Sequence, residues 1–150
     1  VLTADCVPIL IYDKQKKIIA AVHAGWKGAF KEIVKKVIKF MIKKGCKEKS
    51  IIAAIGPCIQ QKNYNVGEDF FKKFIKKNKM NRVFFKKEKK TIYFNLPDFV
   101  KYQLKSMKIT NIDTIKIDTF DIRNNFFSAR RSIKLNHDDY GRNISIIMIN

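Results

Sequence analysis

The sequence predicts a mixed α+β protein, a layered sandwich of mixed β-sheets flanked by helices. Short apolar runs rich in β-branched residues, which are typical of buried strands, occur in both halves of the chain. Between them lie longer segments whose apolar residues recur every three or four positions, the pattern of amphipathic helices. Because strands and helices do not alternate strictly, a layered α+β arrangement is favoured over a doubly wound sheet.

The composition predicts one globular domain over residues 1–150. The chain is 46% hydrophobic and has 12 Phe, which is enough for a substantial core. No stretch approaches the roughly 20 apolar residues that cross a bilayer, so we expect no membrane association. Three cysteines without a CxxC pair indicate a reducing compartment, and we expect a cytoplasmic protein.

The formal net charge of +19 raises the question of nucleic-acid binding. The lysines occur as pairs scattered over all the predicted elements, without one basic stripe interleaved with aromatic residues. We therefore interpret most of the charge as a solvated surface and expect no specific nucleic-acid partner.

The first two apolar runs, residues 7–12 and 18–23, flank a polar cluster and predict a β-hairpin. If Lys14 and Gln15 form a two-residue loop, Cys6 lies directly opposite His23, with Cβ atoms about 5 Å apart. A register shift of two residues keeps both side chains on one face, whereas a shift of one residue separates them. The spacing can therefore bring a thiol and an imidazole together.

The remaining elements follow from periodicity and from capping residues. A helix after the Gly25–Gly28 turn should end at Gly45, and Asn95 should cap a later helix that runs to about Met107. The predicted helices cover residues 29–45, 66–78 and 95–107, and the further strands cover 50–56, the neighbourhoods of Phe84 and Tyr93, 112–119 and 143–149.

Cysteine thiolate and neutral imidazole are common zinc ligands, and a catalytic zinc usually has three protein ligands and one open position. Cys6 and His23 are two candidates, whereas His137 falls in a polar loop where a solvated side chain is expected. Two other interpretations remain open: a Cys–His nucleophile and base pair, and a buried structural histidine.

Six motifs, in this order, are similar to those of the laccase-domain family: "TADCVPILIYD", "AAVHAGWKG", "AAIGPCI", "YNVGEDF", "FFSARR" and "GRNISIIM". Bacterial members of that family were first called polyphenol oxidases and are now described as purine nucleoside phosphorylases. The resemblance implies a cytosolic enzyme that binds zinc, or copper, and acts on purine nucleosides and phosphate. The implied reactions are phosphorolysis of adenosine, inosine, guanosine or methylthioadenosine, and deamination of adenosine.

The resemblance also assigns Cys6 in "TADC" and His23 in "VHAGW" as metal ligands. The family's remaining ligand is a histidine upstream of "TADC", so this chain resembles the later part of the family domain, without its N-terminal part. The alternative is a truncated, catalytically inactive relative that serves as a structural or interaction module.

Further site candidates follow from the mechanism that the resemblance implies. Arg130 or Arg131 would hold phosphate, and if their segment is extended the two side chains point to opposite faces, so at most one enters the pocket. The turn from Gly25 to Gly28 would help to position phosphate. Asp5 is a candidate acid–base residue or support for the metal, or else it caps a turn.

Two aromatic residues and two acidic residues complete the set. Trp26 and Tyr64 could stack on a purine, although large aromatic residues beside a sheet more often serve packing. Asp118 and Asp121 stand where family members often have cysteines, and we expect them at a solvated strand end. The Gly-Pro-Cys turn that contains Cys58 is expected to be structural.

Overall fold

The computed structural model describes residues 1–137 and 139–149. Its central sheet has four strands in the order β3–β2–β4–β8: β2 (Val7–Asp13), β3 (Ile18–Ala24), β4 (Ile51–Ile55) and β8 (Asn111–Thr114). Strand β2 is antiparallel to β3 and β4, whereas β4 and β8 are parallel. This mixed sheet, with helices packed on it, confirms the predicted α+β class.

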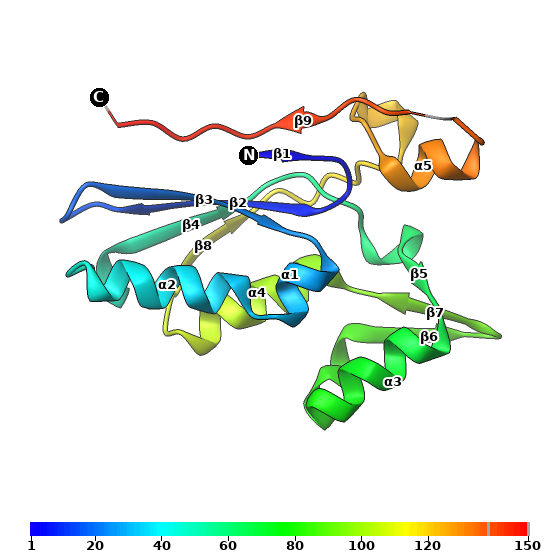
Figure 1. Cartoon of the computed structure of the whole chain (residues 1–150), viewed down its shortest axis with the longest axis horizontal. Helices are drawn as coiled ribbons and strands as arrows, with labels where there is room; N and C mark the ends of the chain where they lie inside the picture. Colours follow the sequence, from blue (N-terminus) through cyan, green and yellow to red (C-terminus); the bar gives the residue numbers. More distant parts are fainter. Residues whose placement is uncertain (138, 150) are drawn as a thin grey trace.

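Three helices cover one face of the central sheet, as Figure 1 shows: α1 (Trp26–Phe30), α2 (Ile33–Lys43) and α4 (Leu96–Ser106). The main core lies between these layers. Ile9 and Ile11 of β2 and Ile38 of α2 are completely buried there. Each fully buried side chain of this size contributes about 1.5–3 kcal/mol, so alternate strand residues and one helix stripe hold the two layers together.

A second sheet of three strands, in the order β5–β7–β6, packs against α3 (Glu68–Lys77). Its strands are β5 (Asn65–Val66), β6 (Phe85–Glu88) and β7 (Thr91–Phe94). Aromatic rings fill the space beneath it: Phe74 and Phe94 are fully buried, with ring centroids 4.8 Å apart. Many of the phenylalanines thus form this second part of the core.

The two ends of the chain run side by side (Figure 1), because β1 (Leu2–Thr3) pairs antiparallel with β9 (Asn143–Ile144). Helix α5 (Ala129–Lys134) precedes β9. Short 3₁₀ turns connect the other elements: η1 (Glu48–Ser50), η2 (Gln61–Asn63), η3 (Lys79–Phe84) and η4 (Ile122–Asn124). Within residues 1–137 and 139–149, no helix is long and apolar enough to cross a membrane.

The predicted hairpin forms, but its predicted register is wrong by two residues. Pro8, not Cys6, lies opposite His23. The loop contains the four residues between Asp13 and Ile18, because Asp13 Oδ1 accepts hydrogen bonds from the N–H groups of Gln15 (3.0 Å) and Lys16 (2.6 Å). An aspartate side chain that bonds the following backbone stabilises a wider turn than the two-residue loop we expected. A shift of two residues preserves the face on which each side chain lies.

Four other local expectations also differ from the structure. The helix expected over residues 29–45 is two helices, because Glu32 adopts a left-handed conformation (φ 59°) between α1 and α2. The strand expected over 112–119 ends at Thr114, and that expected over 143–149 ends at Ile144. The segment with Arg130 and Arg131, considered as possibly extended, is helical.

The strand at 51–55, helix α3 and helix α4 confirm the sequence patterns. Asn95 caps α4 as predicted, because its Oδ1 accepts a hydrogen bond from the Asp98 N–H at 3.1 Å. Strand β7 follows the prediction near Tyr93, whereas Phe84 lies in η3 and β6 starts one residue later.

The Asp13 carboxylate is completely buried at the end of β2 and stabilises both this turn and η1. Burial opposes its ionisation, but hydrogen bonds from the Ser50 hydroxyl and from the Lys16 and Gln15 N–H groups outweigh burial and lower its pKa. A carboxyl whose pKa is lowered on folding stabilises the fold above its unfolded pKa, about 3.9, and this stabilisation is lost as the pH falls below that value.

We therefore expect Asp13→Asn to destabilise the protein by about 1–3 kcal/mol at pH 7. The difference from the wild type should shrink below about pH 4, where the wild-type carboxyl takes up a proton. Urea unfolding at pH 7 and pH 3.5 measures both effects. Asp113→Asn, at an exposed residue of β8, is the control. An equal cost at both pH values would contradict the proposed role of the charge.

Candidate active site

Cys6 and His23 meet beside Gly25, although they are not directly opposite each other in the hairpin. A Cβ atom built on Gly25 would lie 2.8 Å from Cys6 Sγ and 3.9 Å from His23 Nε2. Both ligand-type atoms therefore approach one point at the end of β3. The His23 side chain is exposed, which excludes the interpretation as a buried structural histidine, and Cys6 is half-buried.

Position 25 requires glycine because there is no room for a side chain, and not because of its backbone angles. Its φ of −72° and ψ of 170° are accessible to any residue, but a methyl group would collide with the Cys6 sulfur. Gly28 lies in α1, where its nearest neighbours are Ile33 Cγ2 and the His23 carbonyl oxygen. Gly28 therefore serves the packing of α1 on β3.

A cavity of about 280 Å³ opens beside Cys6. Five predicted site residues line it: Asp5, Cys6, Trp26, Tyr64 and Arg130. The other lining residues are Ala4, Ile59, Leu96, Ala129 and Ile133. Residues far apart in the sequence thus form one small, mainly apolar chamber with a thiol, a carboxylate and a guanidinium on its wall.

Asp5 connects the segment before β2 to the start of α5. Its Oδ1 accepts a hydrogen bond from Thr119 Oγ1 at 2.8 Å, and its Oδ2 accepts one from the Arg130 N–H at 2.7 Å. Its backbone is held at φ 80°, an uncommon conformation for a residue other than glycine. Since both carboxylate oxygens are engaged, Asp5 holds the first turn of α5, whose N-cap is Ser128, and sets the position of Cys6, the next residue.

The two arginines have different surroundings. Arg130 lies over the Tyr64 ring, with its Cζ 5.2 Å from the ring centroid, and its Nη1 donates to Asn65 Oδ1 at 2.8 Å. Arg131 donates to the carbonyl oxygens of three residues that precede α5, at 2.5–3.0 Å: Thr119, Phe120 and Phe126. Arg130 therefore faces the cavity, whereas Arg131 holds the loop before α5.

The two aromatic wall residues also belong to the packed core. Trp26 contacts Phe70 at a centroid distance of 5.1 Å, and Tyr64 packs against Phe94 at 6.0 Å. Tyr64 is 8% exposed, and burial raises its pKa, so its hydroxyl keeps its proton at neutral pH. Their packing fixes the rings that bound the cavity.

Burial, assisted by the negative charge of Asp5, raises the pKa of the Cys6 thiol. Activated cysteine nucleophiles have the opposite shift, so this environment disfavours the nucleophile and base interpretation. Burial also raises the pKa of Cys58 to about 12, and this fully buried thiol is structural, as the Gly-Pro-Cys turn predicted.

The expectation of a solvated strand end at Asp118 is wrong. Asp118 is 4% exposed, and its oxygens accept hydrogen bonds from the Phe120 N–H at 3.0 Å and from Asn63 Nδ2 at 2.7 Å. Asp121 instead forms an ion pair with Arg123 at 2.6 Å. Thr119 and Asn65 were not predicted as site residues, since no local pattern connects either residue with the partner that it meets in space.

The residues present fit two positions of a metal site. Thiolate sulfur and imidazole nitrogen form a donor set that suits zinc, and Cys6 and His23 approach one point. In the part of the chain that the structure describes, no group of three His, Cys, Asp or Glu side chains could hold a metal ion. His137 is exposed in the loop after α5, as expected.

A family model described as "Multi-copper polyphenol oxidoreductase laccase" matches residues 1–150. The chain belongs to this family. A purine nucleoside phosphorylase of Rickettsia conorii is 38% identical over 146 residues, which cover 96% of this chain and 60% of that protein. A protein named adenosine deaminase RL5, from an unknown prokaryotic organism, is 38% identical over 98 residues, or 65% of this chain and 32% of that protein.

The crystal structure of the hypothetical protein YfiH of Bacillus licheniformis has the same fold. It superposes with a TM-score of 0.82 at 28% identity, over 94% of this chain and 53% of YfiH. The chain therefore spans about half of this relative and 60% of the Rickettsia conorii protein.

The geometry around Gly25 yields a direct test. We expect Gly25→Ala to destabilise the protein by about 1–3 kcal/mol, the usual cost of overpacking, and to slow the reaction of Cys6 with a disulfide reagent, because the new methyl group meets its sulfur. Cys46 and Cys58 are buried, so the fast-reacting thiol of the native protein should be Cys6. Urea unfolding and thiol titration measure the two effects.

Gly67→Ala is the matched control for this substitution. Gly67 also precedes a helix, at φ −78° and ψ 166°, but has no atom within 4 Å of an added Cβ. Both glycines are N-cap residues, so alanine at the N-cap should cost the same stability in each variant. The remaining difference between the two variants measures the collision of the new methyl group with Cys6 Sγ. Equal effects of the two substitutions would show that Cys6 does not approach Gly25.

Proposed function

We propose that this chain forms the catalytic part of a zinc-dependent purine nucleoside phosphorylase in which Cys6 and His23 are two of the metal ligands. The observation that carries the proposal is the approach of Cys6 Sγ and His23 Nε2 to one point beside a cavity with aromatic walls and an arginine. The printed name of the Rickettsia conorii relative supports this choice of reaction. The three free thiols suit the reducing cytoplasm.

The substrate-binding part of the proposal follows from the cavity wall. At about 280 Å³, the cavity is near the lower end of ligand pockets, roughly 300–1,000 Å³, so a purine base fills it and the ribose lies at its mouth. Trp26 and Tyr64 provide ring surfaces for the base. The protonated Tyr64 hydroxyl can donate a hydrogen bond to a base nitrogen or oxygen.

Phosphate would bind at Arg130. Only its Nη1 is used by Asn65, so Nε and Nη2 can donate two parallel hydrogen bonds to phosphate oxygens. In phosphorolysis a phosphate oxygen forms a bond to ribose C1′, the bond from C1′ to the purine nitrogen breaks, and the purine takes up a proton. Arg130 orients the attacking phosphate and compensates its charge.

Zinc at Cys6 and His23 would act as a Lewis acid that polarises a bound water or substrate oxygen. Its other coordination positions need water, substrate or a further side chain. The relatives are longer than this chain, so an additional ligand from another part of such a protein is compatible with the site.

The relative named adenosine deaminase RL5 favours adenosine deamination as a second activity at the same site, because attack of water on a purine carbon can use the same metal and base pocket. Copper is the competing metal suggested by the family's description. The rival to both activities is an inactive module, which would retain the fold without turnover.

Metal binding tests the two ligands. We expect Cys6→Ser and His23→Ala each to abolish zinc retention and phosphate-dependent release of hypoxanthine from inosine, with the fold intact, since apolar packing and backbone pairing hold the hairpin. Zinc and copper contents by mass spectrometry, an inosine assay with and without phosphate, and circular dichroism are the measurements. His137→Ala, at the other histidine, should retain zinc. Zinc retained after both ligand substitutions would refute this site, and zinc without turnover would favour the inactive module.

The arginines should separate binding from stability. Arg130→Ala should raise the KM for phosphate about tenfold or more through loss of hydrogen bonds to a charged ligand, with little change in the unfolding midpoint. Arg131→Ala should instead destabilise the protein by about 1.5–3 kcal/mol, because the three carbonyl oxygens that Arg131 bonds lose their charged donor. Steady-state kinetics and urea unfolding distinguish the two roles. The reverse assignment of effects would contradict the orientation of α5.

A further inference from the structure

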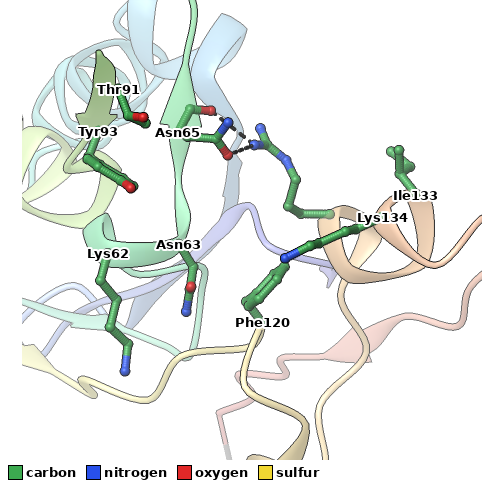
Figure 2. A pocket seen from close by; sticks show the side chains of 9 residues that line it. Lys62, Asn63, Asn65, Thr91, Tyr93, Phe120, Ile133 and Lys134 are labelled. Carbon is green, nitrogen blue, oxygen red and sulfur yellow. Dashed lines mark hydrogen bonds between the residues drawn. The ribbon is translucent and has the colours of Figure 1, made fainter. Parts of the chain in front are cut away.

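A second and larger cavity lies on the other side of Arg130. Its volume is about 540 Å³, well within the roughly 300–1,000 Å³ range of small-molecule sites. Figure 2 shows the lining side chains, which come from η2, β5, β7, α5 and the loop around Phe120. The lining residues are Lys62, Asn63, Asn65, Thr91, Tyr93, Phe120, Arg130, Ile133 and Lys134.

This cavity is positively charged. Lys62, Arg130 and Lys134 line it, whereas no aspartate or glutamate does. Within the described residues, neither Lys62 nor Lys134 has a carboxylate within 4 Å. The Nη1 group of Arg130 bonds Asn65, another lining residue, and within the described residues its Nε and Nη2 groups form no hydrogen bond. Three cations, none of them in an ion pair within the described residues, favour an anion with several oxygen acceptors, such as a phosphate group.

Internal hydrogen bonds organise the cavity before a ligand binds. The buried Asp118 carboxylate holds both the Asn63 side chain and the Phe120 backbone. Asn65 and Tyr93 are directly paired across β5 and β7, so their side chains share one face of that sheet. A preorganised site loses less conformational entropy when it binds a ligand.

The cavity also offers two aromatic rings, those of Tyr93 and Phe120. Both side chains are half-buried, and neither packs against another aromatic ring in residues 1–137 and 139–149. The Lys134 ammonium lies 5.8 Å from the centroid of the Phe120 ring, and Figure 2 shows this side chain reaching toward that ring. Cations beside ring faces suit a ligand that carries both a phosphate and a planar heterocycle.

We propose that this cavity binds a free nucleoside monophosphate, with its phosphate among Lys62, Arg130 and Lys134 and its base against Tyr93 or Phe120. This cavity and the cavity at Cys6 share Arg130 and Ile133 and differ in all their other lining residues. Mononucleotide binding goes beyond the proposed phosphorylase activity, because it needs neither metal nor turnover.

The test is calorimetric titration of the protein with AMP. We expect the double variant Lys62→Glu and Lys134→Glu to bind AMP about tenfold more weakly or worse, because charge-assisted hydrogen bonds are lost. The control is Lys36→Glu with Lys43→Glu, two exposed lysines of α2 that cause the same change in net charge. AMP affinity that is unchanged in the cavity variant, or reduced equally in the control, would overturn the site.

Two further ligands test the chemical class. Ribose 5-phosphate and adenosine should each bind more weakly than AMP, and Tyr93→Ala with Phe120→Ala should weaken AMP without affecting ribose 5-phosphate. If ribose 5-phosphate or adenosine bound as tightly as AMP, the proposal of a nucleotide site would be overturned. Circular dichroism confirms that each variant is folded. AMP binding that persists in a protein without phosphorolysis would refute the proposed function alone.

Discussion

Both cavities depend on the hydrogen bonds that the Asp5 carboxylate accepts. It joins three segments that are far apart in the sequence: the link between β1 and β2, the Thr119 region, and the first turn of α5. Cys6 follows Asp5 directly, and the Arg130 N–H donates a hydrogen bond to the Asp5 carboxylate. One buried acid therefore sets the distance between the thiol and the guanidinium. A carboxylate at a helix N-terminus is also favoured by the helix dipole.

Close approach of the backbone is the second constraint. Gly25 has no side chain where Cys6 Sγ and His23 Nε2 converge, and Gly56 similarly accommodates Pro8, whose Cγ would lie 2.9 Å from an added Cβ. Pro8 lies opposite His23 in the hairpin. The end of the central sheet is thus tightly packed around the pair, although His23 itself is exposed.

Arg130 lines both cavities. Its backbone is held by Asp5, its guanidinium by Asn65, and its plane by the Tyr64 ring. These three contacts leave part of the guanidinium available to an anion on either side. The neighbouring Arg131 uses both Nη1 and Nη2 to hold the loop before α5, which explains why two adjacent arginines have different surroundings.

The sequence by itself determined the α+β class, the hairpin, helices α3 and α4, and the family, because apolar periodicity, the Asn95 cap and ordered motifs are local signals. The pairing face of Cys6 and His23 was also predictable, since side chains alternate along a strand with a period of two residues. The expected two-residue loop was wrong, because the hydrogen bonds of Asp13 with Ser50 and the turn N–H groups form only in the folded hairpin. Tertiary structure alone decided that Asp5 holds the first turn of α5, that Arg130 and not Arg131 faces the cavities, and that Asp118 is buried. Each of these contacts joins residues from distant parts of the chain, and their partners are defined by packing and not by sequence spacing.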